Sequence, residues 1–275
     1  MFASLAEGLD HPEGLAWGPE GRIYAGGEAG QIYAITLDGV TSEVAGTGGS
    51  LLGIALDGRG RIYACDAGRT EVLRVDPSSG SIETILASLP GSRLTLPNAL
   101  AFAPDGVLYV TDSGSQGADD GQVLRVVLGG EAQLFSDEVR AYPNGCCIAP
   151  DGSALYVVES ALPGISRIPI HRDGTAGRRE VIDRTPVVPD GCALDVLGAV
   201  LVSCYRPDRI YRIQPGEPAQ ILADDPRGLT LNAPTNIAFV GDGLHQLAAA
   251  NVGEDFISIA WVEVPGVPLA YPDVA

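Results

Sequence analysis

The stretch that decides the fold is PNALAFAPDGVLYVTD, residues 97–112, which is followed 46 residues later by PNGCCIAPDGSALYVVE, residues 143–159. In both stretches a short apolar run, a PDG turn and a second apolar run follow one another, which predicts a β-hairpin. The same pattern recurs in residues 12–27, 51–66, 189–204 and 234–251. A repeat of this length is typical of propellers and solenoids.

The second residue of each segment marks the period of the repeat. These residues are Glu13, Leu52, Asn98, Asn144, Asp190 and Thr235, separated by 39, 46, 46, 46 and 45 residues. Each hairpin is followed by two more strand-like runs, such as QVLRVV at 122–127 and AQLFSD at 132–137. Four antiparallel strands per repeat form a propeller blade. We therefore predict an all-β, six-bladed β-propeller with four antiparallel strands per blade, occupying residues 1–275 as a single domain.

The last repeat lacks a convincing fourth strand, because its tail, PGVPLAYPDVA at 265–275, is broken by prolines. The N-terminal FASLAEGL at 2–9 resembles the fourth strands of the other repeats. We expect Phe2 to Glu7 to join the last blade, which would close the ring and remove its open edges.

Composition limits the classes of partner. The formal net charge is −18 and all 17 basic residues are arginine, so nucleic acid would be repelled and lysine Schiff-base chemistry is excluded. The five cysteines lack CxxC or zinc-ligand spacing, which fits a reducing compartment. No leader-like or membrane-spanning stretch is present. We predict a cytoplasmic protein that acts on a small molecule, without nucleic-acid or membrane partners, as a monomer or weak homo-oligomer.

Equivalent positions of six similar blades converge around one axis, and four of the marker residues are oxygen donors: Glu13, Asn98, Asn144 and Asp190. Two carboxylates and two amide carbonyls suit a hard divalent cation, and the two negative charges balance it. Pro-Asn and Pro-Asp also occur simply as turns. Glu is a poor turn residue, however, and polar groups on an enclosed axis need pairing. We therefore predict one metal site at the top of the channel.

A second set of polar groups lies at the ends of the second strands, which reach the same face: Gly27, Asp66, Asp112, Glu159, Cys204 and Asn251. Asp66 and Asp112 are explained equally well by turns. Glu159 and Asn251 are candidates for contacting a substrate. Arg93 is a weaker candidate, because it is also explained as a solvated loop residue. None of the three histidines has a nucleophile partner at a recognisable spacing.

Four motifs now make a family recognisable: HPEG at 11–14, LPNALAFAPDGVLYVTD at 96–112, YPNGCCIAPDGSALYVVE at 142–159 and VPDGCALD at 188–195. The chain resembles the SMP-30/gluconolactonase/LRE-like family of calcium-dependent six-bladed propellers, which includes diisopropylfluorophosphatase-like enzymes. The resemblance implies that Glu13, Asn144 and Asp190 bind the cation and that Asn98 is a ligand or contacts substrate and water. It implies Ca²⁺, with Mg²⁺, Mn²⁺ or Zn²⁺ as alternatives. The loop GSRLTLPN at 91–98 departs from the Arg- and Asn-rich pattern expected of a sugar-lactone site.

The leading functional hypothesis is divalent-metal-dependent hydrolysis of a lactone or similar small ester. The metal would polarise the carbonyl, Asp190 would assist the attacking water, and Asn98 would share the catalytic site. One alternative is a phosphotriesterase or phosphofluoridase reaction on the same cation, with Asp190 as a nucleophile. Another is a non-catalytic propeller stapled by its metal that binds a small ligand or a protein. A further one is metal-free chemistry through Glu159.

Overall fold

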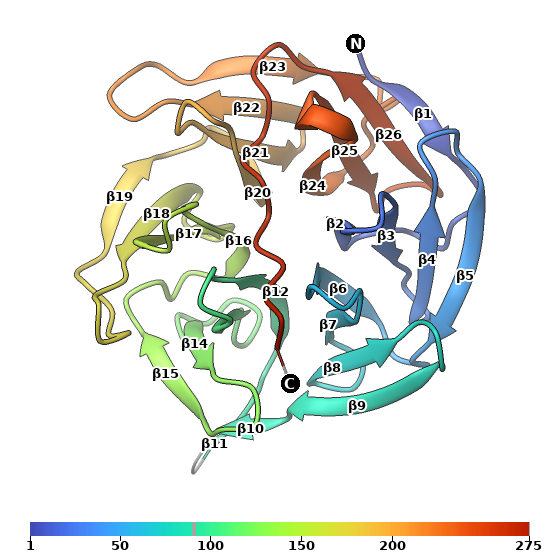
Figure 1. Ribbon diagram of the computed structural model, residues 1–275. Helices are drawn as coiled ribbons and strands as arrows, with labels where there is room; N and C mark the ends of the chain where they lie inside the picture. Colours follow the sequence, from blue (N-terminus) through green and yellow to red (C-terminus); the bar gives the residue numbers. More distant parts are fainter. Residues whose placement is uncertain (90–91, 275) are drawn as a thin grey trace.

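The computed structural model describes residues 1–89 and 92–274, and in these residues six four-stranded antiparallel sheets surround a central axis (Figure 1). The predicted all-β, six-bladed propeller is therefore confirmed. Each sheet is a blade, and its first strand lies nearest the axis. No helix in the described ranges has the length and apolar character needed to cross a bilayer.

The strands occupy equivalent places in the six blades. The innermost strands are β2 (Leu15–Trp17), β6 (Leu51–Leu56), β12 (Pro97–Phe102), β16 (Pro143–Ile148), β20 (Val188–Leu194) and β24 (Pro234–Val240). The second strands are β3 (Ile23–Gly26), β7 (Ile62–Asp66), β13 (Leu108–Asp112), β17 (Ala154–Glu159), β21 (Val200–Tyr205) and β25 (Gln246–Asn251). The third strands are β4 (Gln31–Ile35), β8 (Glu71–Asp76), β14 (Gln122–Val126), β18 (Gly164–Pro169), β22 (Arg209–Ile213) and β26 (Phe256–Trp261).

The outer strands are β5 (Thr41–Gly46), β9 (Ser81–Leu86), β15 (Ala132–Ser136), β19 (Glu180–Asp183), β23 (Gln220–Asp224) and β1 (Ala3–Ala6). A short pair, β10 (Ser88–Leu89) and β11 (Ser92–Arg93), follows the second blade, and a 3₁₀ turn, η1 (Asp242–Leu244), lies in the sixth. The outer strand of the sixth blade is the N-terminal one, because β1 pairs antiparallel with β26. First and last parts of the chain thus share one sheet.

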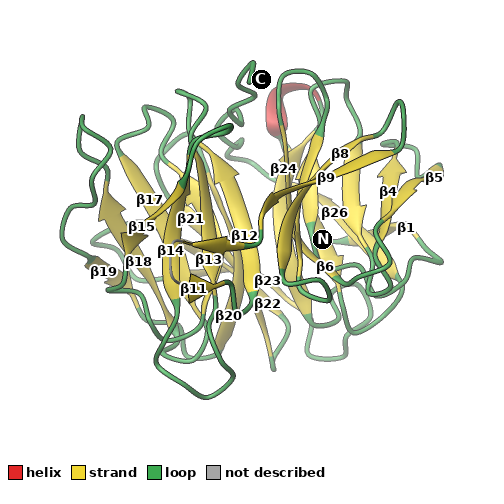
Figure 2. Ribbon diagram, turned by 90° about the horizontal axis from the view of Figure 1, so that it is seen from below, coloured by secondary structure: helices red, strands yellow, loops and turns green. Residues whose placement is uncertain are grey.

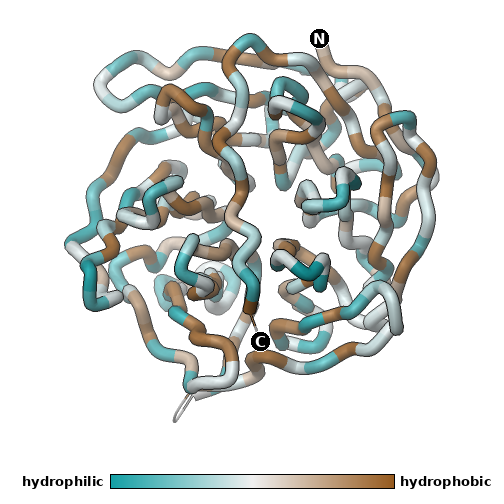
Figure 3. The backbone as a smooth tube through the Cα atoms, viewed as in Figure 1, coloured by the Kyte–Doolittle hydropathy of each residue, from teal (hydrophilic) through white to brown (hydrophobic). Residues whose placement is uncertain are grey.

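Apolar side chains pack between neighbouring blades. Each pair of adjacent blades encloses one cluster of buried residues, and the apolar positions recur along the strands in Figure 3. Between the second and third blades, for example, Tyr63 and Phe102 meet edge to face with ring centroids 4.9 Å apart. Burying a side chain of this size contributes about 1.5–3 kcal/mol, so the inter-blade clusters hold the ring together.

Residues 263–274, here called the C-terminal strap, cross one end of the central channel (Figures 1 and 2). The backbone N–H of Val267 donates to the carbonyl of Leu194 at 3.0 Å, in the fifth blade. Further along, the Tyr271 hydroxyl donates to the Trp17 carbonyl at 2.7 Å, in the first blade. The strap therefore links two blades that are not neighbours in the ring, at the end where the innermost strands finish.

Beneath the strap the channel contains a cavity of about 420 Å³. Its walls are small side chains from the middle of the six innermost strands: Ala16, Ala55, Ala101, Cys147, Ala193 and Ala238. Aromatic and aliphatic side chains at the strand ends complete its apolar surface. The strap end of the channel is consequently apolar, whereas the opposite end carries the marker residues of the repeat.

Candidate metal centre

The marker residues lie where the innermost strands begin, at the end of the channel away from the strap. In five of the six blades, the pairing between the innermost and second strands shifts at this point, as between Pro143 and Cys146. Such β-bulges redirect side chains and are frequent beside functional sites. Glu13 precedes its strand and is held by a hydrogen bond from its backbone N–H to the Gly26 carbonyl, at 3.1 Å.

Glycines directly after two marker residues allow the neighbouring strands to approach closely. A Cβ atom on Gly145 would lie only 2.5 Å from the Asp190 carbonyl oxygen and 2.6 Å from Gly191 Cα. A Cβ atom on Gly191 would lie 2.6 Å from the Thr235 carbonyl oxygen. Any larger residue would push the blades apart, so these glycines bring the marker side chains together around the axis.

Two serines determine which end of each asparagine amide is available. Asn144 Nδ2 donates to Ser160 Oγ at 3.2 Å, and Ser160 Oγ donates to the Pro189 carbonyl at 2.7 Å. The carbonyl can only accept, so the serine hydroxyl must give its proton to it and accept from the amide. The NH₂ group therefore points at the serine, and the Asn144 carbonyl oxygen is the end left for a ligand.

The third blade repeats this arrangement. Asn98 Nδ2 donates to Ser113 Oγ at 3.0 Å, and Ser113 Oγ donates to the Pro143 carbonyl at 2.7 Å. By the same reasoning the Asn98 amide offers its carbonyl oxygen as an acceptor. Because Pro143 directly precedes Asn144, these hydrogen bonds tie the Asn98 amide to the backbone beside Asn144 in the adjacent blade.

Asn144 and Asp190 are also in direct contact. Asn144 Nδ2 donates to Asp190 Oδ2 at 3.0 Å. Both residues are buried, at 3% and 4% exposure, yet Asn144 Oδ1 and Asp190 Oδ1 have no hydrogen-bond partner in the described structure. An unsatisfied buried oxygen costs roughly 1–3 kcal/mol. Two such oxygens on touching residues form a donor set that fits a hard divalent cation.

The pKa values of Asp190 and Glu13 also indicate a cation site at this end of the channel. Burial raises the pKa of Asp190 to about 7, against a smaller opposite effect of the Asn144 hydrogen bond. Burial also raises the pKa of Glu13 to about 8, and the negative charges of Asp190 and Glu28 add to that shift. The charges of Glu13 and Asp190 therefore interact across the channel, and without a cation burial favours the protonated forms of both acids. A bound divalent cation would replace those protons.

The six marker positions do not all contribute donors of this kind. Thr235 Oγ1 donates to the Glu13 carbonyl at 3.0 Å, which links the sixth blade to the first. Leu52 has no polar side-chain atom. The structure thus places Glu13, Asn98, Asn144 and Asp190 at the same end of the channel, and it joins Asn98, Asn144 and Asp190 through hydrogen bonds, with Glu13 coupled through charge.

The repeat analysis missed four residues of this site. Ser113, Ser160 and Tyr205 each come directly after the predicted end of a second strand, and Tyr142 lies two residues before Asn144. Burial raises the pKa values of Tyr142 and Tyr205, and the charges of Glu13 and Asp190 raise them further, which places both phenols near the two acids. Aligning the residue after each second strand would have revealed the serines and Tyr205 as one more ring.

The structure does not support Asn251 as a substrate contact. Its side chain is fully buried, its Oδ1 accepts from the Asn232 N–H at 2.8 Å, and its Nδ2 donates to Ser258 Oγ at 3.0 Å. Nδ2 also reaches two backbone carbonyls, so the whole amide is used in holding the sixth blade together. Position in the repeat predicted the correct end of the channel but not the direction of the side chain.

Glu159 has its own polar contacts in the fourth blade. Glu159 is 1% exposed, forms an ion pair with Arg179 and accepts a hydrogen bond from Ser166 Oγ at 2.9 Å. These contacts engage Oε1 within the fourth blade, whereas Oε2 is buried without a hydrogen-bond partner in the described structure, and burial raises the pKa of the carboxyl group. Arg93 is exposed in β11. Asp66 and Asp112 accept backbone N–H groups from the preceding loops, which agrees with their interpretation as turn residues.

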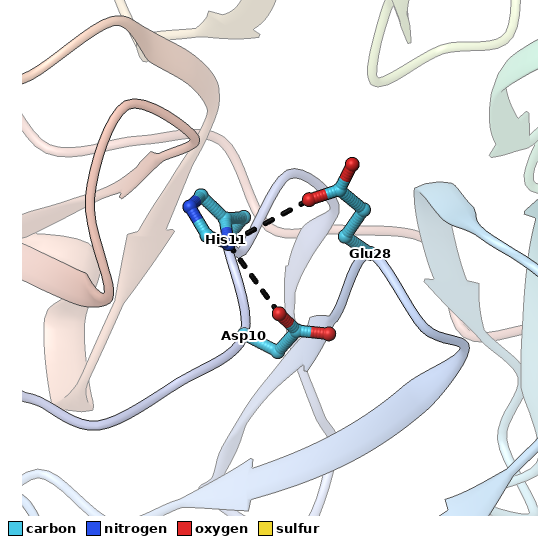
Figure 4. A group of neighbouring side chains, drawn as sticks. All are labelled: Asp10, His11 and Glu28. Carbon is cyan, nitrogen blue, oxygen red and sulfur yellow. Dashed lines mark hydrogen bonds and ion pairs between the residues drawn. The ribbon is translucent and has the colours of Figure 1, made fainter.

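An exposed group of three side chains stands near the same mouth (Figure 4). His11 Nδ1 lies 3.4 Å from Asp10 Oδ1 and 3.6 Å from Glu28 Oε2. Their solvent exposure screens these charges, so the group contributes little to stability. Its effect on the buried site is indirect, because the charge of Glu28 helps to raise the pKa of Glu13.

The fold and these side chains define a six-bladed β-propeller with an oxygen-donor site at one mouth of its channel. The sequence matches the SMP-30/Gluconolactonase/LRE-like region over residues 11–250, and the chain belongs to this family. The predicted family is thereby confirmed.

The individual relatives are only distantly similar to this chain in sequence. The gluconolactonase of Zymomonas mobilis is 27% identical over 188 residues, which cover 61% of this chain and 52% of that protein. The chain spans about half the length of the curated relatives it matches. Among solved structures, a gluconolactonase from Xanthomonas campestris has a TM-score of 0.80 at 22% identity, covering 97% of this chain and 89% of its own. The calcium-binding protein regucalcin from Agrobacterium tumefaciens has a TM-score of 0.79 at 18% identity, covering 98% and 97%. These two structures share the fold.

Proposed function

We propose that the protein hydrolyses a lactone or a similar small ester with the help of one divalent cation held by Glu13, Asn98, Asn144 and Asp190. The observation that carries this proposal is the pair of unpartnered buried oxygens on Asn144 and Asp190. Family membership and the similarity to gluconolactonases support the reaction class. Ca²⁺ is the first candidate, because carbonyl and carboxylate oxygens suit it and a calcium-binding protein shares the fold.

A cation bound by these oxygens would supply Lewis acidity for a substrate carbonyl. The protein's own groups have separate tasks. Asp190 Oδ1 is the oxygen without a partner, whereas Oδ2 accepts the Asn144 amide and keeps a second lone pair. Oδ2 can therefore accept the proton of an attacking water and return it to the alcohol that leaves when the ring opens.

The surroundings of Asp190 suit this proton transfer. Burial raises the pKa of Asp190 in the absence of a cation, and a bound cation would displace that proton and leave the carboxylate ionised, as a general base must be. Ser160 fixes the Asn144 amide, and that amide in turn fixes Oδ2. Tyr142 and Tyr205 lie close enough for the charges of both acids to raise the pKa values of their phenols. Their rings would limit the access of water and shape the entrance for a substrate.

The test is hydrolysis of a panel of sugar, aliphatic and aromatic lactones, followed with a pH indicator. Protein stripped with EDTA is compared with protein restored with Ca²⁺, Mg²⁺, Mn²⁺ or Zn²⁺. We expect activity to vanish on stripping and to return with one preferred cation. Calorimetric titration with each cation runs in parallel. Cation binding without hydrolysis of any panel member would reject the lactonase proposal and leave a metal-binding propeller.

A further inference from the structure

Two cysteines from neighbouring blades touch inside the channel. Cys192 Sγ donates to Cys147 Sγ with a sulfur–sulfur distance of 3.4 Å, and both residues line the cavity beneath the strap. Cys147 belongs to β16 and Cys192 to β20, the innermost strands of the fourth and fifth blades. All five cysteines are free thiols.

Both positions depart from the repeat. Three residues after the marker residue, five blades have alanine and the fourth has Cys147. Two residues after it, four blades have leucine or isoleucine, and the fourth and fifth have Cys146 and Cys192. The contact therefore arises where two different repeat positions change to cysteine in adjacent blades. General packing requirements explain neither change, because alanine or an aliphatic residue serves in the other blades.

The backbones also come close directly above the pair. A Cβ atom on Gly145 would lie 3.1 Å from the backbone nitrogen of Cys192. A disulfide requires sulfurs about 2 Å apart, so the two sulfurs, now 3.4 Å apart, have to move closer for the bond to form. Cys147 is partly exposed and Cys192 is buried, so Cys147 is the thiol that a small molecule in the cavity reaches first.

We propose that Cys147 and Cys192 form a redox-sensitive dithiol that a small hydroperoxide converts into a disulfide between the fourth and fifth blades. The Cys147 sulfur attacks one peroxide oxygen, the O–O bond breaks, and a sulfenic acid and water (or an alcohol) result. The Cys192 sulfur then attacks the sulfenic sulfur, its S–O bond breaks, and a water molecule leaves. Two thiols lose two hydrogens, and the peroxide is reduced. A small-molecule dithiol reverses the step.

The disulfide would link the two blades covalently, close to Asn144 and Asp190. It would close the 147–192 segment into a loop, and cross-links of such long segments stabilise a fold by restricting its unfolded chain. We therefore expect the oxidised protein to unfold at a higher temperature than the reduced protein. Oxidation acts on the scaffold of the candidate metal centre and uses none of its ligands.

The experiment treats the full-length protein with hydrogen peroxide, blocks the remaining thiols with iodoacetamide and maps the disulfides by mass spectrometry without reduction. Wild type should lose two thiols and yield a Cys147–Cys192 link, with a raised melting temperature that dithiothreitol reverses. Cys147→Ala, which restores the residue found in the other blades, should form no such link. Cys146→Ala and Cys204→Ala are matched controls and should behave as wild type.

Three results would overturn the proposal. Wild-type protein could keep all five thiols at peroxide concentrations that oxidise an exposed cysteine in a reference peptide. The link could instead join Cys146 or Cys204 to another residue. Cys147→Ala could lose the same two thiols as wild type. None of these readouts depends on hydrolytic activity, so they test the dithiol whatever the outcome of the lactone assay.

Discussion

The two ends of the channel are built from the same six strands but follow opposite chemistry. At the beginning of the strands, Asn144 and Asp190 each have a buried oxygen without a partner in the described structure, and burial raises the pKa values of Glu13 and Asp190. At the far end, alanines and larger apolar residues surround a cavity of about 420 Å³, and the strap lies across it. The comparison shows that the same repeat brings polar side chains together at one end of the channel and apolar side chains together at the other.

The largest expected effect is on turnover at the polar end. Replacing Asp190 by Asn keeps an oxygen ligand but removes the group that takes the proton, so turnover should fall by about 10²- to 10⁴-fold. The cation dissociation constant should change much less. Lactone hydrolysis and calorimetric cation titration measure the two quantities. Glu83→Gln, which removes a rim carboxylate paired with Arg74, is the matched control. Equal losses in both quantities would eliminate Asp190 as the base.

The next effect concerns Ser160, which we regard as a positioning residue. Ser160→Ala removes one of the two hydrogen bonds that orient the Asn144 amide and should weaken cation binding by about 10-fold, a magnitude usual for groups that orient metal ligands. Ser160→Thr keeps the hydroxyl and should bind the cation nearly as wild type does. Calorimetric titration checks both variants. Unchanged affinity in Ser160→Ala would show that the hydrogen bond to the amide has no role in holding it.

A smaller effect concerns the pH dependence of stability at the polar end of the channel. Glu13 has a pKa raised by burial, so the folded state binds a proton that the unfolded state releases, and its contribution to stability falls as pH rises from about 5 to 8. In EDTA, Glu13→Gln should therefore become progressively more stable than wild type over this range. With Ca²⁺ present the order should reverse, because only wild type has the full ligand set. Urea unfolding at several pH values measures the difference, and a pH-independent difference would contradict the shifted pKa.

The smallest effect belongs to the apolar end. Tyr271→Phe removes the hydrogen bond to the Trp17 carbonyl and should cost about 1 kcal/mol of stability, without changing cation affinity. Thermal unfolding and calorimetric titration test the two parts of this statement. A loss of cation affinity comparable to that of Ser160→Ala would show that the strap and the candidate metal centre are coupled through the channel.

The sequence predicted the fold and the four candidate ligands because both depend on the repeat. Glu13, Asn98, Asn144 and Asp190 share a position, and a ring converts a shared position into proximity. Side-chain direction is a different matter. Asn251 occupies the right position at the right end, yet its amide is fully used by Asn232 and Ser258.

Tertiary contacts between different repeats were also beyond the sequence. Tyr142, which lies beside the acids, was not found because it precedes the aligned segment of its repeat. The strap was recognised only as a proline-broken tail. Its partners, such as Leu194 and Trp17, lie in blades distant along the chain.

The pairing of β1 with β26 has a consequence for how the protein folds during its synthesis. β1 leaves the ribosome long before β26, so β1 has no partner until the five strand sets between them have been synthesised. During that time five blades can assemble, while the sixth presents an open edge that can pair with another chain. Closure of this sheet joins strands that lie far apart in the sequence. We therefore expect it to be the slowest folding step and the one at which chaperones prevent aggregation.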